Sequence, residues 1–361
     1  MANSMNFVGL DVHAHQTALV ALDRETGELT KAKLRTPPLE VLGHLRSLAP
    51  MRAVYESGPT GLGLARKAQA QGLDVRICTP ASSARRPTAR VKTDMRDAER
   101  LARLLAAGEL SFARIPSIAE ECFRDLIRAR EDIRHDLMRA RHRLSKLLLR
   151  RDLRYPRKGG AWTRDHLDWL RALRFDDEPS EAVARDYLAA VEQLLQRRSA
   201  LDEAIESLWP QSPHAEVIAR LRSFRGIDTL TAAGLCAELG DLRRFAKPRF
   251  LFGHLGIVPS EWTTGEQRRQ GAITKAGSTH ARRLLIEAAH HCRHRPNVSA
   301  GLERRQRGQD PRVVAIAWRA QQRLHERWMH LRLGRKKPAG VVSVALAREL
   351  AGFAWEAAVL D

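Results

Sequence analysis

Short apolar runs alternate with helix-like spacing over the first 110 residues of the chain. We predict helices from Pro38 onward, between Gly61 and residue 71, and over 92–107, where apolar residues recur every three or four positions. The runs that we predict to be strands cover residues 7–12, 17–22, 29–35, 52–56 and 75–79. The predicted order is therefore β-β-β-α-β-α-β-α.

That order is typical of an RNase H-like α/β domain, which we place at residues 1–113. The chain then changes character, because Ser117 follows a proline as a helix start and residues 118–150 contain no Pro or Gly. A second long amphipathic stretch runs from about 180 to 208. Two long helices with few aromatic residues predict a helical or coiled-coil region over 114–212. The pair can be an intramolecular bundle or a dimerisation arm, and the pattern favours neither.

The last part of the chain, residues 213–361, is predicted to be mostly helical. Residues 221–235 have the pattern of a helix, a glycine-centred turn and a second helix. Such a helix-hairpin-helix-like segment can offer backbone N–H groups to a phosphate. Two terminal helices are predicted over 310–332 and 341–356.

The charge of the chain indicates a polyanionic partner. It carries 62 Lys+Arg against 42 Asp+Glu, a formal net charge of +20, which suits nucleic acid because neutralised phosphates release counterions. An anionic membrane is the rival partner, but no segment approaches the roughly 18 apolar residues of a membrane span, and we expect no signal peptide. Four widely spaced cysteines without a CxxC motif fit reduced thiols in a cytoplasmic protein.

Four carboxylates are candidates for a metal site. Asp11 ends the first predicted strand and Glu56 ends a later one, where a buried carboxylate is costly unless it is paired or binds a cation. Asp94 and Asp97 are three residues apart, so on a helix they share one face. If that helix crosses the sheet near the two strand ends, all four carboxylates converge. Hard oxygen donors of this kind suit Mg²⁺ or Mn²⁺ and phosphoryl transfer.

Each carboxylate also has a purely structural interpretation. Asp94 can be the N-cap of its helix, and Asp97 a first-turn charge that the helix dipole favours. Asp11 and Glu56 can be strand-end carboxylates without a metal. The four residues together, in this order of strands and helices, favour the metal site.

Other polar patterns carry less weight. His13 and His15 flank the proposed site but supply only two ligands, and the cluster from His290 to His294 has no second Cys/His group to complete a zinc site. The segment around Asp11 is also similar to the first phosphate loop of sugar kinases and actin-like ATPases. No second Asp-Gly loop or P-loop accompanies it.

Motifs in both halves of the chain resemble one family, the DEDD transposases of bacterial insertion sequences known as the IS110 family. In the first half these motifs are Gly-Leu-Asp11-Val-His, Tyr-Glu56-Ser-Gly-Pro-Thr-Gly and Lys-Thr-Asp94-Met-Arg-Asp97-Ala. In the second half they are Phe224-Arg-Gly-Ile, Gly256-Ile-Val-Pro-Ser-Glu, Arg268-Arg-Gln-Gly-Ala-Ile-Thr-Lys-Ala-Gly277 and Arg282-Arg-Leu-Leu-Ile-Glu-Ala-Ala289.

The resemblance implies a recombinase with a RuvC-like domain, a coiled-coil linker and a transposase domain. It implies that a bridge RNA encoded by the element selects donor and target DNA, and that dimers pair into tetramers. A serine of the C-terminal domain attacks the DNA backbone in the family and becomes covalently linked to it, in a composite site between subunits. The metal ligands that the resemblance implies are Asp11, Glu56, Asp94 and Asp97.

This sequence departs from the family at that serine. The family pattern places Ser directly before Gly in the segment after Val-Pro, and here Thr264 precedes Gly265. A threonine hydroxyl can attack once it is activated, although its methyl group stiffens χ1 and crowds the approach. We predict Thr264 as the nucleophile, with Ser260, Ser278 or no competent nucleophile as the alternatives.

Seven basic residues are predicted to bind nucleic acid, although charge runs are usually solvated faces. Trp262 can stack on a base, but packing against protein is the ordinary outcome for such a residue. The basic residues lie close to the two proposed catalytic segments and are Arg85, Arg86, Arg90, Lys92, Arg268, Arg269 and Lys275.

The sequence thus predicts a transposase that cuts and rejoins DNA by metal-assisted phosphoryl transfer. Two alternatives stay open: a RuvC-like nuclease in which water attacks, and a nucleic-acid-binding protein whose active site has decayed. A recombinase would leave protein-linked DNA, a nuclease free 5′-phosphates, and a binding protein intact DNA.

Overall fold

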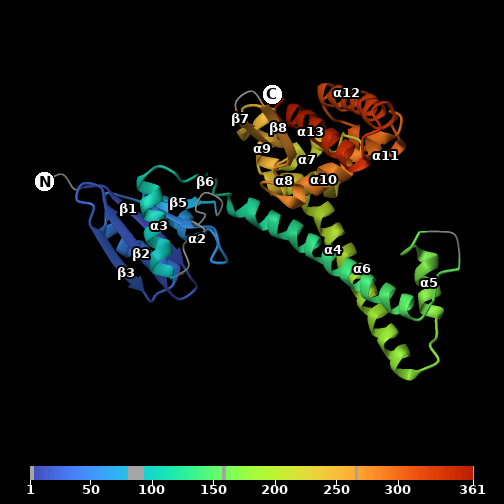
Figure 1. Cartoon of the computed structure of the whole chain (residues 1–361), viewed down its shortest axis with the longest axis horizontal. Coiled ribbons are helices and arrows are strands. Elements are labelled where there is room, and N and C mark those ends of the chain that lie inside the picture. Colours follow the sequence, from blue (N-terminus) through green and yellow to red (C-terminus); the bar gives the residue numbers. More distant parts are fainter. Residues whose placement is uncertain (1–3, 80–92, 157–159, 265–266, 361) are drawn as a thin grey trace. The chain divides into compact units, whose positions relative to one another are not determined.

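The chain folds into two compact units, Met1–Pro116 and Ser117–Asp361, which are shown in Figure 1. The computed structural model describes residues 4–79, 93–156, 160–264 and 267–360, with the backbone alone at 263, 264, 267 and 268. The first unit is a mixed α/β domain with one large sheet, and the second is mostly helical.

One six-stranded sheet forms the centre of the first unit, with the strand order β3-β2-β1-β4-β5-β6. The central strand β1 pairs antiparallel with β2 and parallel with β4, which in turn is parallel to β5. The apolar pattern predicts the first five strands, and β6 is too short to show in it. The strands are β1 (Asn6–Val12), β2 (Thr17–Asp23), β3 (Leu29–Leu34), β4 (Met51–Glu56), β5 (Asp74–Cys78) and β6 (Phe112–Ala113).

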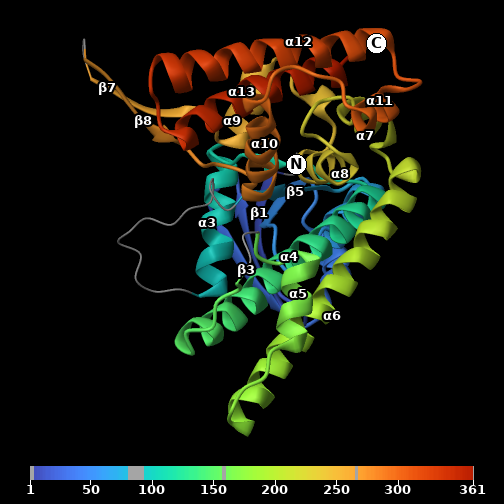
Figure 2. The same cartoon turned by 90° about the vertical axis from the view of Figure 1, so that its right-hand side faces the viewer.

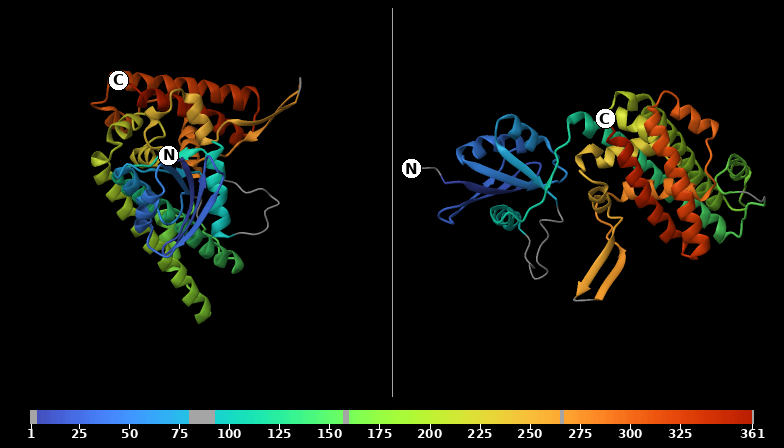
Figure 3. Two further views of the ribbon diagram at one scale, coloured as in Figure 1. Left: turned by 90° about the vertical axis from the view of Figure 1, so that its left-hand side faces the viewer. Right: turned by 90° about the horizontal axis from the view of Figure 1, so that it is seen from above.

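Helices cover both faces of this sheet, as the right-hand view of Figure 3 shows. One face packs its buried side chains against α1 (Val41–Ser47) and α2 (Gly63–Ala70), and η1 (Pro38–Glu40) precedes α1. The opposite face packs against α3 (Asp94–Ala106). Both faces are therefore apolar, which explains the near-continuous hydrophobic runs of the central strands.

A glycine lets α3 approach the central strand closely. A Cβ atom on Gly9 of β1 would lie 1.9 Å from the carbonyl oxygen of Ala98 and 2.6 Å from the amide nitrogen of Ala102, both in α3. Only a residue without a side chain fits at this point. The contact fixes where the first turn of α3 meets the end of β1.

Two long helices begin the second unit. α4 (Ile118–Arg150) and α6 (Glu178–Leu208) run in opposite directions and contact each other (Figures 1 and 2). Ser117 and Glu120 form a capping box at the start of α4, so the predicted bounds of this helix are confirmed. The short α5 (Arg164–Ala172) lies between them in the chain, and its Leu170 packs in one core with residues of both long helices.

The remaining helices of the second unit share a large apolar core with the start of α4. Phe123 and Ile127 of α4 belong to this core, together with residues of α7, α8, α10, α12 and α13. The two predicted terminal helices are confirmed, although the first ends in a π-helical turn. The elements are η2 (Trp209–Gln211), α7 (Ala215–Leu221), α8 (Thr229–Leu239), η3 (Leu242–Arg244), α9 (Pro248–Leu255), α10 (Thr279–His290), η4 (His291–Arg293), α11 (Ala300–Gln306), α12 (Pro311–Trp328), η5 (Met329–Gly334) and α13 (Ala339–Ala358).

A β-hairpin extends away from the helices of this unit, as Figure 2 shows. Its strands, β7 (Pro259–Thr264) and β8 (Gln267–Ile273), pair antiparallel and form the second sheet of the described chain. All four cysteines are free. Within the described ranges, no helix combines the length and apolar character that crossing a bilayer requires.

Candidate catalytic site

The alternation of side chains along the strands directs Asp11 and Glu56 toward α3. Asp11 follows Gly9 by two residues on β1, and Gly9 faces α3. Glu56 follows Val54 by two residues on β4, and Val54 packs in the same core as α3 residues. β1 and β4 are adjacent and parallel, so the two carboxylates occupy the same ends of neighbouring strands.

The first turn of α3 supplies Asp94 and Asp97. The N-cap of this helix is Thr93, whose hydroxyl accepts a hydrogen bond from the backbone N–H of Arg96 at 3.3 Å. The interpretation of Asp94 as the N-cap is therefore wrong, because the chain is already helical at Asp94. The carboxylate of Asp94 is left for side-chain contacts.

Asp94 lies beside Asp11 and a histidine of the β1–β2 turn. The Nε2 atom of His13 lies 3.5 Å from Oδ1 of Asp11 and 3.8 Å from Oδ1 of Asp94. One potential ligand atom from each of these three residues lies within 4.8 Å of the other two. Gln16 donates a hydrogen bond to the other Asp94 oxygen at 3.2 Å. Carboxylates from β1 and α3 thus converge at the end of the sheet.

The other two carboxylates are linked by an arginine. Nη2 of Arg100, in the second turn of α3, lies 3.3 Å from Oε1 of Glu56 and 3.7 Å from Oδ1 of Asp97. The Arg100 side chain is only 24% exposed, and its Nε and Nη1 atoms are buried without a hydrogen-bond partner among the described residues. Arg100 was not among the residues that the sequence singled out.

The charges of this cluster favour a divalent cation. Burial raises the pKa of Asp11 above its ordinary value, His13 opposes this rise, and the carboxylates of Asp94 and Asp97 add to it. The negative charge around Asp11 is only partly balanced, because Arg100 contacts Glu56 and Asp97, and His13 is the basic residue that contacts Asp11 and Asp94. Oxygen donors in this number suit a hard cation. The residues therefore fit a divalent-metal site.

Thr264 belongs to the second unit, at the last position of β7. Its backbone pairs with Gln267 across the hairpin. Two residues earlier, Trp262 is 70% exposed, so it does not pack into a core. The nucleophile candidate is thus at the end of a hairpin that extends from the helices.

One arginine binds the chain at the base of this hairpin. Arg282 of α10, which is 8% exposed, donates hydrogen bonds to the carbonyl oxygens of Leu255 and Gly277 at 3.2 Å each, and also to that of Ala276. Leu255 precedes the hairpin, and the other two residues follow it. One guanidinium therefore joins the chain segments that enter and leave the hairpin.

The two alternative serines have structural roles. Ser260 on β7 donates its hydroxyl hydrogen to the carbonyl of Ala272 across the hairpin at 3.0 Å. Ser278 caps α10 by accepting from the N–H of Ala281 at 3.2 Å and donates to Oε2 of Glu238 at 3.0 Å. The partner of Ser260 is a backbone carbonyl, which does not act as a base, and the partner of Ser278 is the carboxylate of Glu238.

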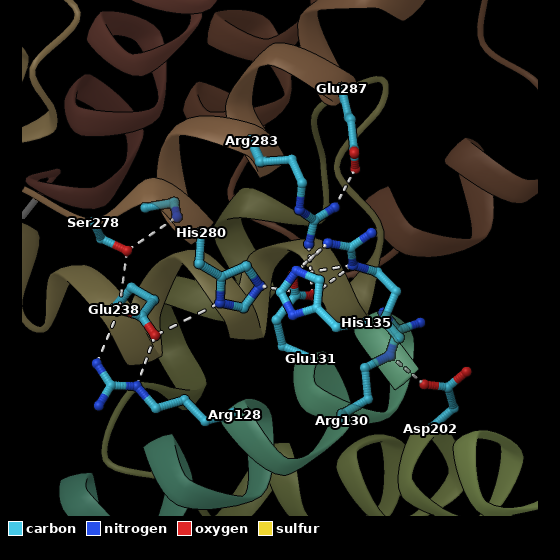
Figure 4. Close-up of polar contacts among 12 residues, drawn as sticks. Arg128, Arg130, Glu131, His135, Asp202, Glu238, Ser278, His280, Arg283 and Glu287 are labelled. Atoms are coloured by element: carbon cyan, nitrogen blue, oxygen red, sulfur yellow. Dashed lines mark hydrogen bonds and ion pairs between the residues drawn. The ribbon is translucent and has the colours of Figure 1, made fainter. Parts of the chain in front are cut away.

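Glu238 lies in a buried network that joins α4, α8 and α10 (Figure 4). Burial by itself would raise the pKa of Glu238, but contacts with His280, Arg128 and Ser278 lower it to about 2. Nε of Arg128 lies 3.0 Å from Oε1 of Glu238, and Nδ1 of His280 lies 3.6 Å from the same atom. A carboxylate that stays ionised so strongly is a weak general base.

The same network continues through His280 to a second carboxylate. Nε2 of His280 lies 3.5 Å from Oε2 of Glu131 on α4, and Arg283 donates to that oxygen at 2.7 Å. Arg134 donates to the other Glu131 oxygen at 2.8 Å. The network (Figure 4) ties the long helix α4 to the helix that follows the hairpin.

The structure describes only two of the predicted nucleic-acid-binding side chains. Lys275 is exposed with a left-handed φ of 58°, and Arg269 is exposed on β8, paired in register with Trp262. The side chain of Arg268 lies outside the described residues, as do Arg85, Arg86, Arg90 and Lys92 entirely.

The histidine-rich segment at the end of α10 does not offer a thiolate ligand. Cys292 is 3% exposed, and burial raises the pKa of its thiol to about 11 against a lowering by Arg225. Arg293 contacts the rings of both His290 and His294. Among the described residues, the grouped metal-ligand atoms are those of Asp11, His13 and Asp94.

Comparison with known proteins matches both halves of the chain to transposases. A family model for DEDD transposases of the IS110 type matches residues 8–151, and a model described as "Transposase IS116/IS110/IS902 family" matches residues 218–303. The putative transposase y4qE of Sinorhizobium fredii is 38% identical over 301 residues, which cover 83% of this chain and 73% of the relative. The transposase for insertion sequence element IS1533 of Leptospira borgpetersenii is 30% identical over 344 residues, 92% of this chain and 98% of the relative.

These matches define the class of the protein as a DNA transposase. The chain belongs to the IS110 family of DEDD transposases, which confirms the resemblance seen in its motifs. Membership of this family implies an RNase H-like fold for the first unit, the use of a divalent metal, and DNA as a binding partner.

Proposed function

We propose that this transposase cuts and rejoins DNA by metal-assisted phosphoryl transfer with Thr264 as the hydroxyl nucleophile. The observation that carries the proposal is the meeting of Asp11 with Asp94 at the end of the sheet, beside the pair of Glu56 and Asp97. Asp11 and Asp94 contact His13 and, among the described residues, no lysine or arginine, so a bound cation would balance their charge.

The four carboxylates would hold Mg²⁺ or Mn²⁺, because hard oxygen donors suit these ions and the cluster is short of positive charge. Such an ion, when bound, assists phosphoryl transfer by activating the attacking oxygen and stabilising charge on the leaving oxygen. Arg100 orients Glu56 and Asp97, and Gln16 orients Asp94, so the ligands are pre-positioned by neighbouring side chains.

The proposed covalent step exchanges one phosphate ester for another. The hydroxyl oxygen of Thr264 forms a bond to a DNA phosphorus, and one bond from that phosphorus to a deoxyribose oxygen breaks. The threonine loses its proton and the departing DNA oxygen gains one, so atoms and charge balance. Attack by a DNA hydroxyl on the threonine ester then rejoins the strands and restores Thr264.

We further propose a RuvC-like domain at residues 1–113, a coiled-coil region at 114–212 and a C-terminal transposase domain at 213–361. The packing of Phe123 and Ile127 in the C-terminal core means that the start of the coiled-coil region is continuous with the transposase domain. A guide RNA encoded by the element, and assembly into dimers or tetramers, follow from the family resemblance. The basic residues would hold these nucleic acids.

Loss of one ligand tests the proposal. Asp11→Asn should lower cleavage of element-end DNA in Mg²⁺ by at least about 100-fold, with the circular dichroism spectrum unchanged. Glu99→Gln is the matched control, because Glu99 is also on α3 but pairs with Lys31 and Arg103. Cleavage by Asp11→Asn at the rate of the control would overturn the metal site. Cleavage that needs Asp11 but leaves free 5′-phosphates and no protein-linked DNA would instead support a water-driven nuclease.

A further inference from the structure

A hollow of about 310 Å³ lies on the helical pair of the second unit, and none of its lining residues belongs to an element that carries a proposed catalytic residue. This volume is at the lower end of the range of about 300–1,000 Å³ that small-molecule sites occupy. Its lining combines basic and apolar side chains and contains no carboxylate: Arg134, Leu137, Met138, Arg141, His142, Trp162 and Arg198.

Within the described ranges, two arginines of this lining have no acidic partner. Burial lowers the pKa of Arg141, and the charge of Arg198 lowers it further, so the two guanidinium groups repel each other. The Nε atoms of both are buried without a hydrogen-bond partner in the described part of the chain. Arg134 differs, because Glu131 pairs with it at 2.8 Å. Unpaired, partly buried cations of this kind are costly unless an anion reaches them.

The stretch of α4 that follows Asp136 is basic. Between residues 137 and 151, α4 contains no Asp or Glu. No carboxylate on this stretch of α4 therefore competes with an anion for Arg141. The basic residues of this stretch are Arg139, Arg141, Arg143, Lys146, Arg150 and Arg151.

The apolar side of the hollow suits a flat ring. The guanidinium carbon of Arg141 lies 5.0 Å from the centroid of the Trp162 ring, which fixes its position by a cation–π contact. Met138 is 42% exposed beside them. An exposed thioether and an indole next to arginines can contact a nucleobase while the arginines contact its phosphate.

We propose that this hollow binds a phosphodiester group and the adjoining base of a single-stranded nucleic acid, with Arg141 and Arg198 on the phosphate and Met138 and Trp162 against the base. A single strand is required because the bases of a duplex are stacked and their faces are covered. The site would add a nucleic-acid contact on the α4–α6 pair. This proposal stands whether or not Thr264 is the nucleophile.

Binding of two short probes tests this site in the full chain. Fluorescence anisotropy would follow fluorescein-labelled 12-mers of oligothymidylate and oligouridylate between 50 and 200 mM salt, the roughly fourfold range over which phosphate contacts are resolved. Arg141→Gln/Arg198→Gln removes two charges from the hollow. Arg143→Gln/Arg197→Gln removes two charges from exposed positions of the same two helices, so it is the matched control.

The cavity variant should bind about 10-fold more weakly at low salt. Its slope of log affinity against log salt should become shallower by about 0.7, because the variant loses one single-strand phosphate contact and each such contact contributes about 0.7. The control should change affinity less than about twofold. Preference for one probe would tell whether the element DNA or an RNA is the natural source of the strand. Equal losses in the two variants would overturn the proposal.

A cross-link to the wild-type protein provides a test that does not depend on whether the variants fold. A 5-iodouridine-containing 12-mer, irradiated on the wild-type chain and analysed by mass spectrometry, should attach to a peptide with Met138 or Trp162. Attachment elsewhere only would contradict the proposal. So would a cavity variant that changes from dimer to monomer with unchanged affinity for the probes, since the hollow would then bind carboxylates of a second copy.

Discussion

Nη2 of Arg100 lies 3.3 Å from Oε1 of Glu56, which joins the second turn of α3 to the end of β4. The same nitrogen lies 3.7 Å from Asp97. In this IS110-family transposase, one partly buried guanidinium thus contacts two of the four proposed metal ligands. Side chains that orient ligands in this way usually matter almost as much as the ligands themselves.

Replacing Arg100 should therefore impair the reaction without removing a ligand. We expect Arg100→Gln to lower the DNA cleavage rate by about 10- to 100-fold, because Glu56 and Asp97 lose their common partner. Arg103→Gln is the control, since Arg103 is on the same helix and is bound to Glu99. Cleavage rates measured across a Mg²⁺ titration check this. Equal rates for the two variants would show that Arg100 has no positioning role.

The close contact of Gly9 with α3 predicts a sensitive backbone position. Gly9→Ala should destabilise the protein by about 3 kcal/mol and displace Asp94 and Asp97 from Asp11, because the new methyl group would overlap the Ala98 carbonyl. Gly43→Ala is the control in α1, where nothing lies within 4 Å of an added Cβ. Its effect should be neutral or stabilising by up to about 1 kcal/mol. The midpoints of urea unfolding measure the stability of the two variants. Similar midpoints for Gly9→Ala and Gly43→Ala would contradict the packing of α3 against Gly9.

The buried carboxylate of Glu238 predicts an acid-dependent loss of stability. Its pKa is about 2 in the folded protein against an ordinary value of 4.5, so the folded state binds the proton less readily than the unfolded state. The resulting stabilisation is complete above pH 4.5 and is lost as the pH falls toward 2. It amounts to on the order of 3 kcal/mol at neutral pH.

Glu238→Gln should remove that dependence. The free energy of unfolding of the variant should be lower than that of the wild type at pH 7. The two values should converge at pH 2–3. Glu287→Gln should change stability by less than about 1 kcal/mol, because Glu287 is 59% exposed although it pairs with Arg283. A wild-type protein whose stability is the same at pH 7 and pH 3 would contradict the role of Glu238.

The proposed nucleophile can be exchanged for the residue that the family uses. Thr264→Ser should preserve or raise the recombination rate, because it keeps the hydroxyl and removes the methyl group that restricts χ1. Strand-transfer assays with element-end DNA measure the effect, and a clear loss of activity would count against this position.

The apolar pattern is sufficient to predict the first five strands of the first unit and both long helices. It worked because β1 and β4 are covered on both faces, and because α4 begins at a capping box and contains no helix-breaking residue. The β7–β8 hairpin could not be predicted, since its strands are largely polar and Trp262 is exposed rather than packed. The cap of α3 was also ambiguous, because Thr93 and Asp94 are both good N-cap residues and only the backbone decides between them.

The candidate site, too, could be predicted from the sequence only in part. Strand ends and a helix turn can be aligned from the sequence, and in the structure Asp11 and Asp94 lie close together. The contacts of His13 and Arg100 could not be anticipated. His13 approaches Asp11 because the turn before β2 directs it back. Arg100 resembles an ordinary solvated charge of a helix until the sheet is placed beside it.

A covalent-trapping assay tests the central claim most directly. The purified transposase, Mg²⁺, labelled element-end DNA and host RNA would be mixed, denatured and separated on a gel. The account predicts a labelled band at the size of the protein that is absent in both Thr264→Ala and Asp11→Asn. Contradiction would come from nicked DNA without that band, or from a band that persists in Thr264→Ala, since either result would show that Thr264 is not the nucleophile.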